Sequence, residues 1–471
     1  DNGLFGEIQS GFETNGNNSA SRAELQYVKN KFNLTVNGEY REYGDYKDGN
    51  GVETPSGFIT KSYSAKAGYN FTDNQTIRLD WRQKFGDQII HTGLPMDSPF
   101  DDSYSLGLDY KWKSVSENIK NISFKSYYTF VDHLMTNGFD LDDPRPNYPA
   151  TDARTPVTSN SYGGRFEIEH QPNEKLNVFY GFDLDNIYRE GKKSVTANIN
   201  PNTGEPFAIP TTTIAEVWQD ATTTDFGTFT EINYLINSNL AITAGARMDY
   251  VTAKIESPDP GFLAIYGNVS DKTDVTVAGH AGLKFNKKGW NSQLSFGRGV
   301  RTASMLERYI YRFEIGSDSR QYIGNPDLKP EESVSYELGF DQQLNTGLQV
   351  YGSVYQTKID NLQVSSAKTG YKYYNIDKAT LTGTELGLKW SLNHWFINGE
   401  YAYIRPKNDK TDQDLPNRSR QNFSLSTGWD NGIYGLSTVM EAKGKSKDLQ
   451  DIAGHVSLDV NAYWQITPNI K

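Results

Sequence analysis

Residues 121–135 read Asn-Ile-Ser-Phe-Lys-Ser-Tyr-Tyr-Thr-Phe-Val-Asp-His-Leu-Met, and two kinds of side chain alternate along them. The mostly apolar set is Ile122, Phe124, Tyr128, Phe130 and Leu134, with Ser126 and Asp132 as polar exceptions. The intervening set is Ser123, Lys125, Tyr127, Thr129, Val131, His133 and Met135. Because successive side chains of a β-strand point to opposite faces, this segment predicts a strand with one apolar and one more polar face.

The same division recurs along the chain, while helical periodicity is nearly absent. In 237–251, Leu240, Ile242, Ala244, Ala246 and Met248 oppose Asn239, Thr243, Gly245, Arg247 and Asp249. Lipid on one side of a wall and water on the other require such a pattern. The alternation therefore predicts strands that span a membrane.

About twenty such strands can be placed by this pattern. Their predicted cores are 3–13, 19–29, 32–42, 58–70, 76–86, 102–113, 121–135, 159–170, 175–189, 213–234, 239–256, 272–286, 291–301, 332–344, 348–360, 378–390, 395–405, 419–429, 433–444 and 455–466. After the first connection, 14–18, short turns alternate with long polar connections. The long ones are 43–57, 87–101, 136–158, 190–212, 257–271, 302–331, 361–377, 406–418 and 445–454. Long loops on one rim and tight turns on the other predict a transmembrane antiparallel β-barrel rather than a soluble sandwich.

Composition supports this class and excludes others. Only 36% of the 471 residues are hydrophobic, yet 30 are tyrosine and 23 phenylalanine, a balance typical of a barrel with a polar lumen and a thin lipid belt. The longest purely apolar run, Phe262–Tyr266, is far too short for a spanning helix. Without cysteine there is no disulfide framework or thiolate site. A net charge of −11 argues against nucleic acid as a partner.

The strand count is even, but the last predicted strand is followed by one more short turn, Thr467–Asn469, and the sequence ends at Lys471. Two further strands would make 22, the size of plugged outer-membrane transporters. We therefore expect residues 1–471 to form one barrel domain of the 22-stranded type that lacks its last hairpin.

Several motifs resemble those of TonB-dependent outer-membrane receptors. Gly324–Glu331 reads Gly-Asn-Pro-Asp-Leu-Lys-Pro-Glu and is followed by Ser335–Gly339. Gly297–Arg301, Gly245–Tyr250 and Asn375–Asp377 carry the same likeness. The resemblance implies a protein of the Gram-negative outer membrane, in contact with its lipid, that imports a substrate actively. An inner-membrane TonB complex would drive it through an N-terminal plug domain, which has no counterpart here because strand alternation starts at Gly3.

Two segments resemble the copper-receptor branch of that family: Val131–Asn137, and Gly93–Asp97 with Asp101 and Asp102 after it. The resemblance implies that His133 and Met135 bind the copper ion to be transported. A cysteine and a methionine of the plug would complete the site.

The chemistry of the pair stands independently of the resemblance. Two residues apart on a strand, the side chains of His133 and Met135 share a face, and parity with Lys125 and Thr129 predicts that this face is the lumen. Imidazole nitrogen with thioether sulfur suits copper and is poor for calcium or magnesium. The alternative is a histidine and a methionine that merely sit near a rim.

Three other groups of residues are weaker candidates for binding a ligand. His91 and Met96 share a long external loop and suit either metal capture or plain loop structure. Asp140, Asp142 and Asp143 resemble the start of a calcium loop that lacks its glycine and distal glutamate. The arginines Arg298, Arg301 and Arg308 suit an anionic siderophore or hydrogen bonds to a plug.

These observations predict active copper import. A siderophore receptor of the same fold is the first alternative, and a passive porin-like channel is another. No nucleophile elbow, phosphate loop or helical zinc motif is present, so neither an enzyme nor a catalytic cofactor is expected. A surface adhesin, binding a macromolecule through its loops, is a further alternative.

Overall fold

The computed structural model describes residues 2–139, 145, 147–315, 318–344, 347–365, 370–415, 418–447 and 451–467. The three aspartates of the possible calcium loop, Asp140, Asp142 and Asp143, lie outside this part of the chain. So do residues 468–471 of the predicted last turn. Nearly all regular structure in the described residues is β-strand.

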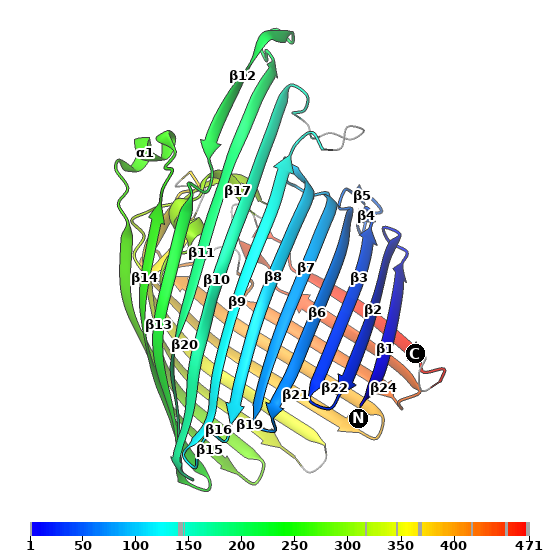
Figure 1. The fold of residues 1–471 in the computed structure, drawn as a ribbon, viewed down its shortest axis with the longest axis vertical. Helices are drawn as coiled ribbons and strands as arrows, with labels where there is room; N and C mark the ends of the chain where they lie inside the picture. Colours follow the sequence, from blue (N-terminus) through cyan, green and yellow to red (C-terminus); the bar gives the residue numbers. More distant parts are fainter. Residues whose placement is uncertain are drawn as a thin grey trace.

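One antiparallel sheet of 22 strands forms the molecule, and twenty of these strands make a continuous wall in chain order (Figure 1). The wall strands are β1 (Gly3–Glu13), β2 (Asn18–Lys29), β3 (Phe32–Tyr43), β6 (Phe58–Thr72), β7 (Gln75–Ile89), β8 (Asp97–Lys113), β9 (Ile119–Thr136), β10 (Thr151–Asn173), β11 (Leu176–Ile199), β13 (Ala221–Asn237), β14 (Leu240–Ile255), β15 (Lys272–Lys287), β16 (Trp290–Arg301), β19 (Glu331–Gln343), β20 (Leu348–Ser365), β21 (Tyr373–Leu392), β22 (Trp395–Asn408), β24 (Gln421–Asp430), β25 (Tyr434–Lys443) and β28 (His455–Trp464). The predicted all-β fold of the 22-stranded type, with about twenty strands in this chain, is confirmed.

The remaining elements, all short except β12, attach to the wall or its loops. The other two sheet strands are β12 (Pro206–Glu216), which pairs with β11, and β23 (Gln413–Asp414), which pairs with β22. Small hairpins are β4 (Tyr46–Lys47) with β5 (Glu53–Thr54), β17 (Tyr311–Ile315) with β18 (Asp318–Ile323), and β26 (Ser446–Lys447) with β27 (Asp451–Ile452). Two helices, α1 (Pro260–Tyr266) and α2 (Met305–Tyr309), lie in long loops. No helix in the described residues is long and apolar enough to cross a membrane.

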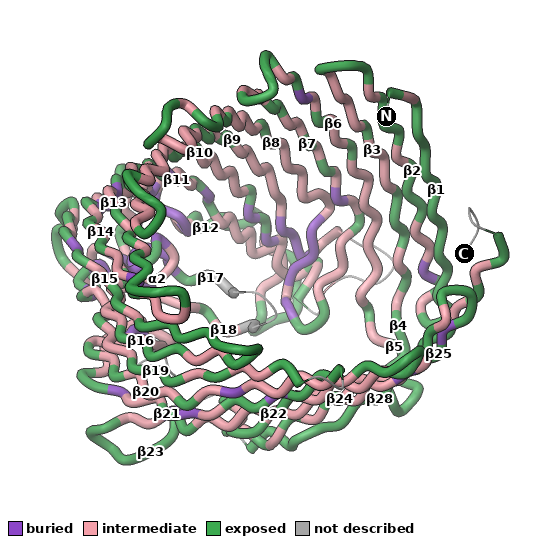
Figure 2. The backbone as a smooth tube through the Cα atoms, turned by 90° about the horizontal axis from the view of Figure 1, so that it is seen from below, coloured by how far each residue is buried: buried purple, intermediate pink, exposed green. Residues whose placement is uncertain are grey.

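Seen along its axis, the wall curves into a ring (Figure 2). Within the described residues, β1 pairs only with β2 and β28 only with β25, so no hydrogen-bonded ladder joins the first strand to the last. The expectation that a plug and a final hairpin lie outside these 471 residues stays a prediction.

Connection lengths separate the two rims as predicted. At one rim the strands turn tightly, for example at 30–31, 238–239 and 393–394. The opposite rim carries the long connections, together with both helices and the three small hairpins (Figure 1). Capping residues stabilise the start of each helix. Ser304 and Glu307 form a reciprocal capping box on α2, and Asp259 caps α1 just before a proline.

One predicted strand and one predicted loop are wrong. The predicted strand 213–234 is two strands, β12 and β13, and most of the predicted loop 190–212 is the paired extension of β11 and β12 above the rim (Figure 1). The chain breaks at 217–220 because Val217 and Trp218 are buried against loop side chains, while Gln219 and Asp220 take positive φ angles of 58° and 50°. A turn with those angles ends a strand.

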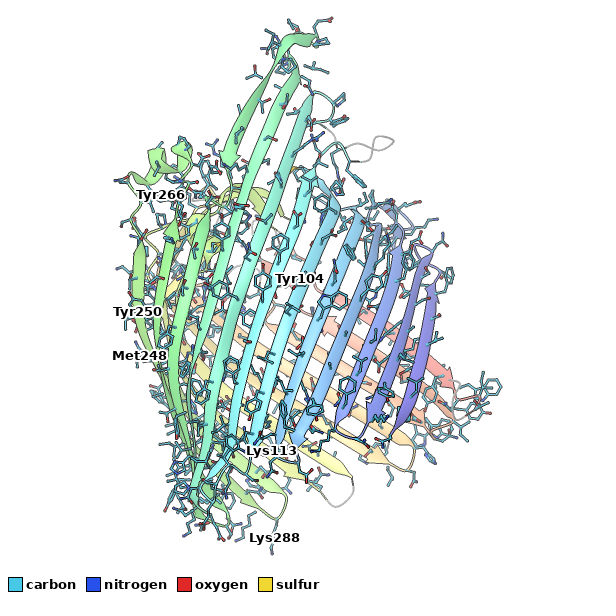
Figure 3. All side chains as sticks on the ribbon, in the orientation of Figure 1. Tyr104, Lys113, Met248, Tyr250, Tyr266 and Lys288 are labelled. Atoms are coloured by element: carbon cyan, nitrogen blue, oxygen red, sulfur yellow. The ribbon has the colours of Figure 1, made fainter. Side chains whose placement is uncertain are left out.

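The two faces of the wall differ as the alternation predicts. Directly opposite residues of six neighbouring strands form an apolar row: Val36, Ala65, Trp81, Leu106, Tyr128 and Tyr162. Met248 and Tyr250 of the same face lie along the outer contour of the wall (Figure 3). The inward face of the same strand carries Arg247, which pairs with Asp183 at 2.7 Å and with Asp249 at 2.6 Å. Buried segments lie inside the ring, and single buried residues such as Val251 and Ala379 also occur in the wall strands (Figure 2).

A charge on each face tests this orientation. Leu106→Lys puts an ammonium on the apolar outer row, whereas Thr129→Lys puts it on the inward face beside Ser105 and Ser161. We expect Leu106→Lys to lower the free energy of unfolding from lipid vesicles by about 2–4 kcal/mol, and Thr129→Lys to change it little. Urea titration of the two variants measures this difference. Equal losses would contradict the assignment of faces.

Candidate metal site at the long-loop rim

His133 and Met135 lie near the end of β9, at the long-loop rim, and their side chains share one face. That face is the inward one. Asp183 lies opposite Arg165, and Arg165 lies opposite Lys125 of β9, with unbroken pairing from Lys125 to Met135. His133 lies opposite Asp101 of β8, and its Nδ1 is 3.6 Å from the Oδ2 of that carboxylate.

A β-bulge in β8 brings Ser98 to Met135. Between the pairs Asp97–Thr136 and Phe100–Leu134, two residues of β8, Ser98 and Pro99, oppose Met135 alone. Proline has no N–H to donate to a ladder, so a bulge accommodates it. The Oγ of the fully buried Ser98 donates to the Sδ of Met135 at 3.2 Å.

The same hydroxyl also contacts the connection before β8. Ser98 Oγ lies 2.9 Å from Nε2 of His91, and Met96 lies with Met135, Leu94 and Ala153 in one buried cluster. Met96 is 2% exposed and Met135 is 5% exposed. The two His–Met pairs, which are more than 35 residues apart in sequence, therefore meet at one place in the fold.

Sequence reasoning treated these pairs separately. The fold joins them because β8 and β9 form an antiparallel hairpin in which Asp97 lies opposite Thr136. The antiparallel register, which pairs the start of β8 with the end of β9, could have predicted that the two His–Met pairs lie close together. The path of the connection 90–96 could not be predicted, because its residues follow no periodic pattern.

A buried ion pair fixes this connection. Arg145 Nε donates to Oδ2 of Asp97 at 2.7 Å, and Arg145 Nη2 donates to the His91 carbonyl at 2.8 Å. Asp97, whose side chain is 4% exposed, also accepts from the backbone N–H of His91 at 2.9 Å. Two bonds thus hold the backbone of His91 beside β8, and the Arg145–Asp97 pair joins their two partners.

Burial lowers the pKa of His91, and the positive charges of His133 and Arg145 act in the same direction, while Asp97 and Asp101 oppose them. The neutral imidazole is therefore favoured. Neutral imidazole is the form that binds metals.

The donor set is soft rather than acidic. Within the described ranges, no group of three or more His, Cys, Asp or Glu side chains is arranged to hold a metal. What the site offers is imidazole nitrogen and thioether sulfur, which suit copper better than calcium or magnesium.

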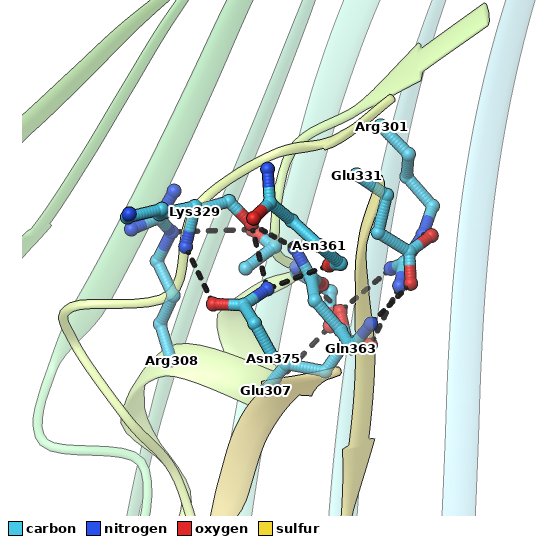
Figure 4. Close-up of polar contacts among 10 residues, drawn as sticks. Arg301, Glu307, Arg308, Lys329, Glu331, Asn361, Gln363 and Asn375 are labelled. Carbon is cyan, nitrogen blue, oxygen red and sulfur yellow. Dashed lines mark hydrogen bonds and ion pairs between the residues drawn. The ribbon is translucent and has the colours of Figure 1, made fainter. Parts of the chain in front are cut away.

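The three candidate arginines all have partners within the chain. Arg308, 2% exposed, pairs with Asp274 and donates to the carbonyl of Pro326 at 3.2 Å. Arg301 bonds both Glu307 and Glu331 at 2.7 Å (Figure 4). Burial raises the pKa of Glu307, but hydrogen bonds from Arg301 and Ser304, together with the charge of Arg301, lower it by more. The remaining contact is Arg298 with Glu332, at 2.7 Å.

The Gly324–Glu331 motif anchors the largest loop to the wall. The carbonyl of Lys329 accepts from Gln363 at 2.8 Å and from Asn375 at 3.1 Å, while Asn375 Oδ1 accepts from the Lys329 N–H at 3.0 Å (Figure 4). Gly324 packs so closely that a Cβ there would lie 2.5 Å from the Arg308 backbone. The motif residues and the three arginines thus stabilise the conformation of the largest loop.

Removing the partly buried Arg145 beside His91 tests the role of the ion pair. Arg145→Leu leaves the Asp97 carboxylate buried without its partner, and breaking such a pair costs roughly 3–5 kcal/mol. We expect faster hydrogen exchange of the amides in 90–98, measured by mass spectrometry. Arg154→Leu, which removes an exposed pair with Asp152, should leave this exchange unchanged. Unchanged exchange in Arg145→Leu would contradict the role of the ion pair.

Known proteins resemble this chain in sequence and in structure. The vitamin B12 transporter BtuB of Vibrio vulnificus is 31% identical over 153 residues, which cover 31% of this chain and 24% of that protein. BtuB of Photobacterium profundum is 26% identical over 161 residues, covering 31% and 26%. The chain thus spans about a quarter of the length of these curated relatives.

Solved structures match nearly the whole chain. The copper transporter OprC superposes with a TM-score of 0.83 at 18% identity, over 99% of this chain and 72% of that one. The siderophore receptor PiuA of Acinetobacter baumannii gives 0.76 at 15% identity, over 99% and 76%. These likenesses establish the fold.

The family described as "TonB dependent receptor-like, beta-barrel" matches residues 30–471, almost the entire chain. Barrels of this family lie in the outer membrane of Gram-negative bacteria, which is the location of this protein. The family is one of receptors and transporters. The chain belongs to the TonB-dependent receptor β-barrels.

Proposed function

We propose that this chain is the membrane wall of a TonB-dependent importer whose substrate is copper. Copper binds at the long-loop rim through His133 and Met135, and the energised inner-membrane TonB complex drives its release inward through a plug domain. The observation that carries the proposal is the position of the two side chains. Both lie on the inward face near the rim, and Met135 belongs to a buried cluster that includes a second methionine, Met96.

The site can take a soft cation before transport. His133 is partly exposed, so an ion arriving from outside can reach the imidazole, while the side chain of Met135 is buried. Asp101, 3.6 Å from the ring, adds negative charge beside it. Carboxylate, imidazole and thioether together attract a cation and then discriminate in favour of a soft one.

The siderophore alternative finds less support in the geometry. An anionic chelate needs cationic side chains that are free to bind it. Arg298, Arg301 and Arg308 are instead engaged by Glu332, by Glu307 with Glu331, and by Asp274. Releasing them would break the bonds that anchor the largest loop.

Each of the remaining alternative functions predicts a different observation. A passive channel requires the gene to encode no plug, so sequencing upstream of Asp1 separates it from gated import. An outer-membrane enzyme would show hydrolytic activity that is lost on mutation of a lumenal serine or histidine. An adhesin would bind a macromolecule without uptake.

Copper loading of the protein purified from outer membranes tests the proposal. Met135→Leu keeps the side-chain volume nearly constant but removes the sulfur, and His133→Ala removes the imidazole. We expect each to lower copper content, measured by mass spectrometry of the metal, while leaving the barrel folded.

The matched control is Met248→Leu, which removes a sulfur from the outer face and should load like wild type. Equal loading in wild type, His133→Ala and Met135→Leu would end the assignment to this pair. Uptake of labelled copper that persists without the TonB complex would instead contradict energised import.

A further inference from the structure

We propose that the outer face of β16 and β19–β22 binds a phosphorylated lipid of the outer leaflet at the long-loop rim. The phosphate groups of the headgroup contact Lys358, Lys378 and Arg405, and the acyl chains lie along the apolar wall beside them. This surface faces away from the lumen, so the proposal does not depend on the candidate metal site.

The register of the strands shows that a row of cations faces outward. Met248 lies along the outer contour of the wall (Figure 3), and it is opposite Val277 of β15. Gly279, two residues further along β15, shares that face and is opposite Arg298 of β16. Directly opposite residues continue the row across the sheet: Arg298, Val334, Lys358, Thr380 and Lys407. We refer to this set as the cationic row.

The cationic row lies just beyond the apolar belt of the wall. The next row towards the tight turns is Phe296, Tyr336, Gln356, Thr382 and Arg405. The row after that includes the exposed apolar side chains of Leu294, Leu338 and Val354. Rings of Phe296 and Tyr336 lie 5.4 Å apart, as in the aromatic girdle that borders the belt of a membrane barrel. The cationic row is about 7 Å further along the strands and therefore lies at the level of lipid headgroups.

Three cations of this surface have no bonded partner in the protein. Lys358, Lys378 and Arg405 are exposed. Within the described residues, none of the three side chains makes a hydrogen bond or an ion pair. Lys358 and Arg405 flank β21 on its two sides, and Lys378 lies diagonally across from Lys358, about 7–8 Å away. These side chains are long enough to contact one headgroup together.

The carboxylates near the cationic row lie on its loop side, where they are less accessible from the lipid. They are Glu332, Asp360, Asp409 and Asp412. Glu332 pairs with Arg298 at 2.7 Å, and Asp412 pairs with Lys407. Neither the cationic row nor the row of Phe296 contains an acidic residue. A phosphate group that approaches from the lipid therefore meets positive charge first.

Across the ring, the same rim carries the opposite charge (Figure 2). Asp102 of β8 and Asp132 of β9 lie directly opposite one another, on the outward face that holds Leu106. Asp87 of β7 shares this surface and pairs with Lys61 at 3.1 Å. Phosphate is repelled by these carboxylates. We therefore expect anionic lipid to bind at one side of the barrel rather than around its whole circumference.

The donors between β20 and β22 suit phosphate bound to a lipid. The guanidinium of Arg405 can donate two hydrogen bonds to one phosphate, and Lys358 adds a point charge. Gln356 Nε2 donates to Thr382 Oγ1 at 3.4 Å, and within the described residues the hydroxyl of Thr382 donates to no other group. A soluble anion gains only such polar contacts. A lipid also keeps its acyl chains against the apolar wall, so this surface favours the lipid.

General attraction between basic side chains and an anionic membrane surface is the competing explanation. Lys358→Gln and Arg405→Gln each remove one positive charge from the proposed site. The matched control is Lys61→Gln, which removes the same charge from the outward face of the same rim, on the acidic side. If charge anywhere along the rim were sufficient, the control would behave like the two site variants.

The experiment measures binding of bisphosphorylated lipid A to the protein purified from outer membranes and held in detergent, by native mass spectrometry. We expect Lys358→Gln and Arg405→Gln each to weaken binding about fivefold, and the double variant to weaken it about twentyfold. Lys61→Gln should bind like wild type, and excess inorganic phosphate should not displace the lipid. Heat-modifiable mobility on gels verifies that each variant is folded.

Four results would overturn the proposal. The first is wild-type affinity in both site variants, and the second is an equal loss in Lys61→Gln, which assigns the effect to general charge at the rim. Equal binding of a dephosphorylated lipid A would show that the acyl chains alone are recognised. Displacement by inorganic phosphate would show an anion site with no preference for lipid.

Discussion

A membrane-spanning wall must satisfy every backbone N–H and C=O group within the chain, because lipid offers no partner for them. In this protein the eighteen inner strands of the wall do so by pairing with a neighbour on each side, while β1 and β28 each pair on one side within the described residues. Pairing fixes the alternation of side chains, since each residue faces either lipid or the lumen. The apolar row through Trp81 and Leu106 and the inward pairs of Arg247 are two consequences of this one constraint.

The candidate site follows from the same constraint. Alternation along β9 turns His133 and Met135 inward, and the antiparallel register places the start of β8 against the end of β9. The bulge at Ser98 and Pro99 then aims the Ser98 hydroxyl at the Met135 sulfur. A one-residue slip of this register would turn both candidate ligands to lipid.

The sequence predicted the wall well because alternation is local. Most strand cores lie within a few residues of the observed strands, and the two rims were separated correctly. The break between β12 and β13 was missed because 217–220 turns only where Val217 and Trp218 bury themselves against distant loop residues. No periodic pattern encodes that contact.

Loop contacts were likewise beyond local patterns. The partners of Arg301 and Arg308 lie on other elements, which only the folded chain brings together. The meeting of His91 with Met135 depends on the course of a connection whose residues follow no period. Strand parity therefore predicts which face a ligand occupies, whereas the full donor set is determined by tertiary packing.

Under the proposed function, the inward face of β9 holds the transported metal. The most direct measurement is a crystal structure of the protein purified from outer membranes and soaked with copper(I), with an anomalous map calculated at the copper edge. The proposed function predicts an anomalous peak within bonding distance of the His133 imidazole and the Met135 sulfur. Copper bound elsewhere, with both of these side chains unligated, would contradict it.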